Sequence, residues 1–508
     1  MSILIKNILL LNGTNQPATR ADVLIKHDKI AAVGSFPQYK ADEIFDGLGS
    51  AYLAPGFIDI NTYSDLYLGL FSKPSQENFI KQGVTTIIGG QSGISLAPLL
   101  YGKPDLHRFW AEHFKFNTDW HSVGEFLDFM KTKKLGVNFG TFIGHSTVKE
   151  EIIGDDFRDL TVKEIDVFRL ILDRSMKEGA FGISFDLNFP LTALTSTKEI
   201  KLFFEAAAKH RGLISFKLRN GSDAVLPAKT LKENFLPAVN EIINLAKETM
   251  AKTQINNFSC PKGLERDYES ALDSINENSA SADVFFNFHL SDETIIPAFY
   301  FLPGWALRGG FNEILKNIND SEIRKKIKKD MPILKTEEIV IFRVPEFRHL
   351  EGKTLKEFIQ NTELDSKEGL LELLRQTKLK VVVNFRNLSL KRIPLALVND
   401  RSIISSSGQD FDNRNPSDSG IGTFLNYLNL VFKDKILPAE KAIKKITSLP
   451  ASRLGLKNRG VIKEGYCADL VLIRDGKIET VIVNGQITLR NGELTAVNAG
   501  KILKHSHV

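Results

Sequence analysis

The sequence has 508 residues, of which 43% are hydrophobic and 25% are charged. These proportions are typical of a globular protein, and the length predicts a large core plus an additional domain. The 66 basic and 61 acidic residues leave a net charge of +5, which is mild for this length. We therefore expect no nucleic-acid or anionic-membrane partner, because such binders concentrate basic residues on one face.

The cysteine content and the lengths of the apolar runs indicate the cellular compartment of the protein. The two cysteines, Cys260 and Cys467, cannot make a disulfide framework in a chain this long, which favours a reducing environment. The first residues lack the pattern of a signal peptide, which is a basic region followed by an apolar region and then by small residues. No apolar run approaches the roughly 18 residues that a membrane span needs. We expect a cytoplasmic protein with no membrane partner.

Both ends of the chain read as β-rich. Short apolar or alternating runs, each typical of a strand, occur at 3–11, 21–25, 30–33, 468–473, 478–483 and 486–489. Asp-Gly and Asn-Gly dipeptides, which favour tight hairpin turns, separate the C-terminal runs. Because these segments bracket a long middle region, we predict one composite β-sandwich formed from residues 1–54 and 455–508.

The middle of the chain alternates short apolar strands with amphipathic helical stretches. Eight strands are predicted, at 56–61, 85–90, 137–144, 182–187, 213–218, 254–258, 283–288 and 402–407. Eight strand-helix units predict an α/β fold with a closed (β/α)₈ TIM barrel over residues 55–454. The gap before the eighth strand is too long for one helix, so residues 291–351 are predicted to form an inserted subdomain after strand 7. The basic run at 324–329 within it is interpreted as a solvated helix face.

Motifs in a fixed order carry a family resemblance. They lie at 53–59 (LAPGFID), 83–88 (GVTTII), 93–98 (GISLAP), 144–149 (GHSTVK), 178–184 (EGAFGIS), 302–307 (LPGWAL), 351–355 (EGKTL) and 460–472. The chain resembles the N-acyl-D-amino-acid deacylase (D-aminoacylase) type of the amidohydrolase superfamily, in order over nearly its whole length. The resemblance implies a hydrolase of linear amides that uses zinc.

The positions that carry metal ligands in the resembled family hold other residues here. The first-strand His-x-His, the second-strand cysteine, the fifth- and sixth-strand histidines and the eighth-strand aspartate fall on Asn61, Tyr63, Ser92, Lys217, Asn257 and Ser407. A zinc site needs at least three converging protein ligands, usually His, Cys or carboxylate. The sole His-x-His of the chain lies at 505–507 in the C-terminal tail, which we expect to be mobile and incidental. We therefore predict a degenerate metal site and no cofactor.

The charge of Lys217 is a second reason to expect no metal ion at this site. An ammonium about 4 Å from a dication would cost roughly 8 kcal/mol at an effective dielectric of 20. We interpret Lys217 as filling the place of the cation, and we expect Asp186 to pair with it, since both should lie at strand C-terminal ends. A purely structural alternative stays open, in which Tyr63 and Asn257 are ordinary core residues of a repacked barrel mouth.

Three functions are compatible with these residues. The favoured one is a degenerate, metal-free homologue that has lost amide hydrolysis and acts in binding, regulation or assembly, with a small-molecule ligand at the barrel mouth. The second is a metal-independent enzyme that uses His145, Lys217 and Asp186 as catalytic groups. The third is an active zinc-dependent N-acyl-D-amino-acid deacylase. Arg219 and Ser184 are candidate substrate-binding residues, and the oligomeric state is left open.

Overall fold

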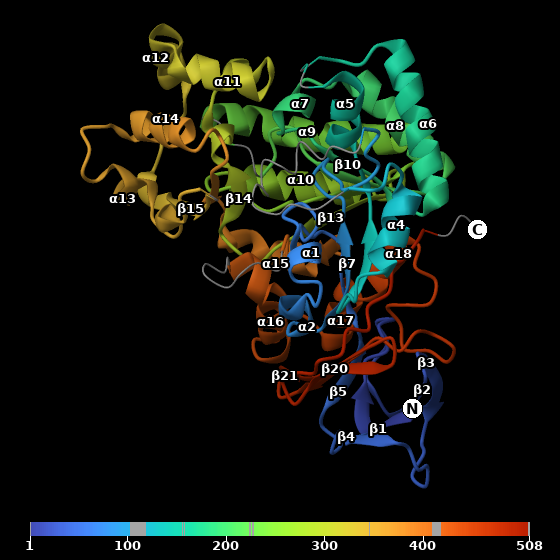
Figure 1. The fold of residues 1–508 in the computed structure, drawn as a ribbon. Coiled ribbons are helices and arrows are strands. Elements are labelled where there is room, and N and C mark those ends of the chain that lie inside the picture. Colours follow the sequence, from blue (N-terminus) through green and yellow to red (C-terminus); the bar gives the residue numbers. More distant parts are fainter. Residues whose placement is uncertain are drawn as a thin grey trace.

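The computed structural model describes residues 2–101, 118–154, 156, 158–222, 225, 228–344, 346–408 and 418–505. Within these ranges, no helix combines the length and the apolar composition needed to cross a membrane. The strands of both chain ends lie together at the bottom of Figure 1, below a barrel that carries a separate lobe of helices on one side. The cytoplasmic location stays a prediction.

The two chain ends share one nine-stranded sheet in the order β21-β20-β19-β18-β5-β1-β2-β3, with β4 paired to β1. The antiparallel pairing of β5 with β18 joins the two halves and places Leu53 opposite Leu472. Apolar residues of both ends then fill one buried cluster. The strands are β1 (Ser2–Leu10), β2 (Thr19–Lys26), β3 (Lys29–Gly34), β4 (Glu43–Asp46), β5 (Tyr52–Pro55), β18 (Leu470–Arg474), β19 (Lys477–Val483), β20 (Gln486–Arg490) and β21 (Glu493–Leu494).

A buried polar network ties this sandwich to the barrel. Asp469 pairs with Arg459 and accepts from Asn484 N at 2.7 Å and from Asn138 Nδ2 at 3.1 Å. Asn484 Nδ2 in turn donates to Asn138 Oδ1 at 2.7 Å. Because Asn138 belongs to the third barrel strand, the network fixes the orientation of the sandwich against the barrel. The C-terminal motif therefore has a structural role here.

Parallel strands form the barrel in the predicted order. Their two sheets run β6-β7-β8 and β17-β13-β12-β11-β10-β9, and β8 and β9 together make the third barrel strand. Tyr63 N donates to Gly408 O at 2.8 Å just beyond the first and eighth strands, which helps to close the ring. The strands are β6 (Phe57–Asp59), β7 (Val84–Gly89), β8 (Asn138–Thr141), β9 (Ile143–Gly144), β10 (Gly182–Asp186), β11 (Leu213–Lys217), β12 (Lys252–Ile255), β13 (Val284–Phe288) and β17 (Ser402–Ile404).

Amphipathic helices cover the outside of the barrel. Helix α6, for example, begins with a capping box in which the Thr161 and Glu164 side chains satisfy each other's backbone amides, and it buries Phe168 and Leu172. These helices are α1 (Gly69–Ser72), α2 (Glu77–Ile80), α4 (Val123–Lys131), α5 (His145–Ile153), α6 (Val162–Glu178), α7 (Pro190–Ala193), α8 (Thr197–Lys209), α9 (Ala228–Thr249), α10 (Glu265–Glu277), α15 (Ile393–Val398), α16 (Asp418–Phe432), α17 (Ala439–Ile446) and α18 (Ser448–Leu454).

A subdomain is inserted between β13 and β17. Its strands form a sheet in the order β14-β16-β15, and its helices form the lobe at the upper left of Figure 1. Its core is continuous with the barrel mouth, because Tyr63, Tyr67, Ile94 and Phe189 belong to the same buried cluster. The elements are β14 (Thr294–Pro297), α11 (Gly310–Asn319), α12 (Ser321–Asp330), β15 (Ile339–Arg343), α13 (Leu355–Ile359), α14 (Ser366–Gln376) and β16 (Val382–Phe385).

The structure confirms the predicted fold class, with a TIM barrel, a β-sandwich from both termini and an insertion after the seventh barrel strand. The exact domain boundaries stay predictions. The interpretation of the basic run as a solvated face was too simple. Arg324 and Lys328 of α12 pair with Glu368 of α14 and with Asp365, which caps it, because the two helices pack together.

Candidate functional site

Five of the six positions at which the family resemblance places metal ligands form one hydrogen-bonded network at the barrel mouth. Asn61 Nδ2 donates to Asn257 Oδ1 at 2.8 Å and to Ser407 Oγ at 3.2 Å. Ser407 Oγ donates to Asn257 Oδ1 at 2.6 Å. Asn257 Nδ2 donates to the Tyr63 hydroxyl at 3.2 Å, and that hydroxyl lies 2.9 Å from Ser92 Oγ. All five residues are buried, so neutral amides and hydroxyls bind one another at these positions.

The network continues through amides that the sequence did not single out as site residues. Asn287 Oδ1 accepts from Asn257 N at 3.1 Å and lies 3.4 Å from Asn61 Nδ2. Asn287 Nδ2 donates to Asn256 Oδ1 at 2.6 Å, and Asn256 Nδ2 donates to Gln91 Oε1 at 2.9 Å. A polar residue inside an apolar strand, as in the Phe-Asn-Phe run of β13, is the signal that could have found Asn287.

The backbone at three of these positions has an unusual conformation. Ser92, Asn257 and Ser407 have φ values of 54°, 52° and 49°, in the left-handed region that non-glycine residues seldom adopt. Such residues cost of order 1 kcal/mol each or more, and they cluster at functional sites because the surrounding structure must hold them. Three strand ends of the barrel therefore have a strained backbone, and their side chains meet in one network.

Lys217 and Asp186 form a buried ion pair at the same mouth. They are register partners at the ends of the adjacent strands β10 and β11, and Lys217 Nζ lies 3.4 Å from Asp186 Oδ2. Their side chains are 9% and 5% exposed. The pairing expected from the sequence is thus confirmed.

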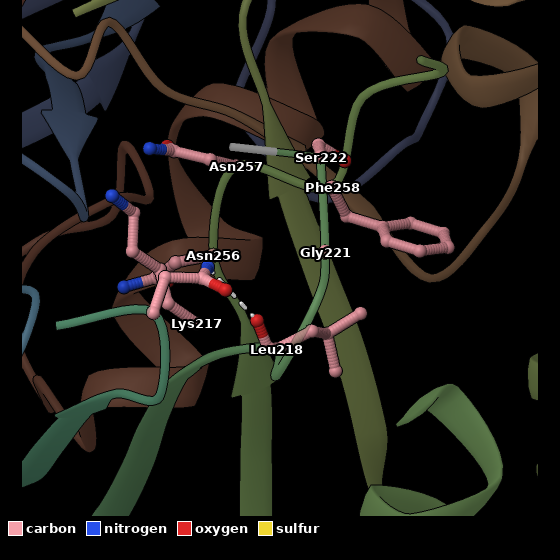
Figure 2. Close-up of a pocket in the computed structure, with 8 residues that line it drawn as sticks. Lys217, Leu218, Gly221, Ser222, Asn256, Asn257 and Phe258 are labelled. Carbon is pink, nitrogen blue, oxygen red and sulfur yellow. Dashed lines mark hydrogen bonds between the residues drawn. The ribbon is translucent and has the colours of Figure 1, made fainter. Parts of the chain in front are cut away.

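Lys217 also lines a small pocket between the ends of β11 and β12. Figure 2 shows the side chains of Lys217 and Asn257 pointing to the same side of this pocket, away from the Phe258 ring. Ser222, which also lines the pocket, donates its hydroxyl to Ser259 O at 2.5 Å. Asn256 and Asn257 line the pocket as well, so the pocket borders the polar network.

The two candidate substrate-binding residues are engaged in structural contacts. Arg219 donates to Thr195 O at 2.7 Å and to Ala193 O, which fixes its guanidinium to the turn between α7 and α8. Ser184 Oγ donates to Gly90 O at 2.5 Å and accepts from Gly93 N at 3.0 Å. These bonds hold loops at the mouth in place, and a role of Arg219 or Ser184 in substrate binding stays a prediction.

His145, a catalytic candidate from the sequence, lies away from the mouth. Its ring packs among Phe168, Phe185 and Phe203, with centroid distances of 5.2, 4.7 and 5.2 Å. Phe185 alternates along β10 with Ser184 and Asp186, so it faces the outer helices while they face the barrel. The position of His145 at the start of α5 follows a strand end, but its side chain turns outward, and the structure does not bring it to Lys217 and Asp186.

The sequence and the fold of this chain are similar to those of known proteins. Residues 344–488 match the model of the amidohydrolase family. The chain is 27% identical to a D-aminoacylase of Alcaligenes xylosoxydans xylosoxydans over 97% of this chain and 96% of that protein. A solved D-aminoacylase structure, from work on the binuclear metal center of that enzyme, is 25% identical and covers 99% of both chains with a TM-score of 0.81.

Over nearly its whole length this chain is therefore similar to amidohydrolase-superfamily proteins of the D-aminoacylase type. A second solved structure, N-acyl-D-glutamate deacylase from Bordetella bronchiseptica complexed with zinc and a phosphonate inhibitor, has a TM-score of 0.80 over 99% of both chains at 20% identity. The D-aminoacylase-type fold thus extends over the sandwich, the barrel and the insertion together.

Two buried carboxylates of this D-aminoacylase-type barrel lie close to the network. Asp59 accepts from Asn61 N at 3.3 Å and from Ser406 N at 3.1 Å, and burial raises its pKa to about 7. Asp65 accepts from Gly90 N at 2.5 Å, and burial raises its pKa to about 6. Among the described residues, no group of three or more His, Cys, Asp or Glu side chains is arranged to hold a metal ion.

Proposed function

We propose that this D-aminoacylase-type protein does not hold a catalytic metal, does not hydrolyse N-acyl-D-amino acids, and acts in binding, regulation or assembly. The observation that carries the proposal is the neutral network among Asn61, Tyr63, Ser92, Asn257 and Ser407. Metal-activated water needs a cation that lowers its pKa to around 7 and a base that takes its proton. The residues at these positions do not fit that requirement.

The chemistry of the donors supports this argument. Zinc prefers imidazole, thiolate and carboxylate, and the six positions hold two amides, two aliphatic hydroxyls, a phenol and an ammonium. Oxygen ligands of the amide and hydroxyl kind suit harder cations and are needed in larger number. In this chain the Asn61 Nδ2 and Asn257 Oδ1 atoms are already bonded to each other. A metal would have to break these bonds in a buried site, which costs free energy.

The charge of Lys217 opposes a dication at the same mouth. Its partner Asp186 compensates one positive charge at 3.4 Å, and the neutral network supplies no further anion. The backbone at Ser92, Asn257 and Ser407 nevertheless has a left-handed conformation. We infer that the barrel keeps the backbone geometry of a ligand site while its side chains have become a polar core.

A hydrolysis assay tests the proposal. We expect no release of amino acid from N-acetyl-D-amino acids, with or without added zinc, while the Alcaligenes D-aminoacylase run in parallel is active. Asn61→His alone should not create activity or zinc binding, because at least three ligands must converge at about 2.0–2.3 Å. The combination of Asn61→His, Tyr63→His, Ser92→Cys, Lys217→His and Ser407→Asp is the matched variant in which zinc binding is expected to return. Zinc-dependent turnover by the unmodified chain would overturn the proposal.

A further inference from the structure

A cluster of three buried ionisable side chains lies outside the barrel mouth, between α5 and α8. His145 Nε2 lies 3.4 Å from Glu199 Oε1, and Lys149 Nζ lies 3.6 Å from the same oxygen. The side chains of His145, Lys149 and Glu199 are 0%, 1% and 3% exposed. Buried charges are expensive unless they are paired, so the charge state of each of the three depends on the other two.

The charges of the cluster are paired, but several of its polar atoms make no well-aligned hydrogen bond to the described residues. His145 Nδ1 and Nε2 and Glu199 Oε1 have no well-aligned hydrogen bond within the described part of the chain. Three phenylalanine rings surround the imidazole and exclude polar neighbours on their side. A neutral imidazole fits this setting, because the Lys149 ammonium already balances the Glu199 carboxylate. A second cation would leave the cluster with a buried net charge.

The cluster holds the turn on which Arg219 rests. Lys149 Nζ donates to Thr195 Oγ1 at 3.3 Å, while Arg219 donates to Thr195 O at 2.7 Å from the side of the barrel mouth. Glu199 lies in the first turn of α8, and its second oxygen accepts from Leu160 N at 3.1 Å. The segment 193–199 is therefore held by the buried cluster on one side and by Arg219 on the other.

We propose that His145, Glu199 and Lys149 form a proton-sensitive latch. Acidification charges His145 and loosens the 193–199 segment, including the backbone carbonyl groups to which Arg219 donates. Charging His145 places two cations beside one carboxylate in an apolar pocket. The strain is relieved when Lys149 leaves Thr195 or when α8 loosens at its first turn. A group on the outer layer of the barrel thereby alters the position of a residue at the mouth.

The direction of the pH dependence follows from burial. Burial lowers the pKa of His145 below its ordinary value, and the Lys149 ammonium acts in the same direction. The unfolded or locally opened state therefore binds more protons than the closed state just below about pH 6.5, the ordinary pKa of histidine. The latch is fully closed above that pH and weakens as the pH falls below it. Other charges facing the cluster are Arg158 and Asp159, which act on Lys149.

Hydrogen exchange measured by mass spectrometry on the full chain tests the latch. Exchange rates are corrected for the intrinsic pH effect and compared at about pH 8 and about pH 5.5, either side of the ordinary histidine pKa. We expect protection of amides in 193–199 to fall several-fold on acidification, while amides of the β18–β19 hairpin keep theirs. His145→Phe, which keeps a ring among three phenylalanines, should abolish the change.

A matched histidine provides the control. His210 pairs with Asp173 at 2.7 Å at the end of α8, and its ring is 16% exposed, so His210→Asn should leave the response of 193–199 unchanged. If His145→Phe fails to fold, His145→Asn serves as the second variant. Equal protection of 193–199 at both pH values in the unmodified chain would overturn the proposal, and so would an equal loss of protection in the unmodified chain and in the His145 variant.

Discussion

Lys217 carries a positive charge into the barrel mouth, at a position where the family resemblance places a metal-binding histidine. Its ammonium lies beside Asp186, and both side chains are almost fully buried. Breaking a buried pair by removing one partner leaves an uncompensated charge, which typically costs about 3–5 kcal/mol. Each partner therefore depends on the other to remain charged in the buried mouth.

Lys217→Met tests this role. We expect it to lower the free energy of unfolding by about 3 kcal/mol, because Asp186 is left buried without its cation. Lys6→Met is the matched control, since Lys6 Nζ lies 3.4 Å from Asp46 Oδ2 but both side chains are more than a third exposed. That substitution should change the free energy of unfolding by less than about 1 kcal/mol. Equal changes in the free energy of unfolding for the two variants, measured by denaturant unfolding, would show that the Lys217 pair contributes no more than an exposed pair.

The sequence predicted which residues end neighbouring strands, but it did not predict the direction of every side chain or the contacts across the barrel. Lys217 and Asp186 end neighbouring parallel strands, so their proximity follows from the strand pattern alone. His145 follows a strand end too, but the start of α5 turns its ring outward, and no periodicity encodes that turn. The network through Asn256 and Asn287 depends on which inward side chains meet across the barrel, a geometry that one sequence does not contain.

Elements far apart in sequence complete one another in this fold. Strand β5 pairs with β18, and the apolar faces of β1 and β2 are covered in part by Ile462, Leu470 and Ile482. The apolar runs of the C-terminal segment and the hairpin dipeptides between them correctly predicted β18, β19 and β20. The packing of α12 on α14 was missed, because a run of basic residues does not reveal the acidic helix that faces it.

Removal of residues 455–508 tests the shared sandwich. The truncated chain 1–454 leaves the β5 edge and the apolar face of β1 uncovered, so the N-terminal strands should unfold. We expect a lower melting temperature and loss of hydrogen-exchange protection across β1 and β2. Cooperative melting at the temperature of the full-length chain would contradict the account.

The insertion and the C-terminal tail contact the barrel at different places. The insertion shares its buried cluster with Tyr63 and Tyr67. The hydroxyl of Tyr63 also belongs to the polar network of the barrel mouth. The C-terminal tail, which we expected to be mobile, is bound as far as His505. Leu503 N donates to Phe139 O at 2.7 Å and His505 N to Gly179 O at 2.9 Å. His505 is thus fixed beside the end of α6, where its ring packs against Phe181.

The zinc content of the purified, unmodified protein tests the central claim most directly. The protein is produced in zinc-supplemented medium, freed of weakly bound ions, and measured by elemental analysis. We predict well under one equivalent of zinc per chain, because the mouth holds a neutral hydrogen-bonded network and an ammonium where a dication needs anionic or imidazole ligands. Stoichiometric zinc that a chelator removes together with a deacylase activity would contradict this account.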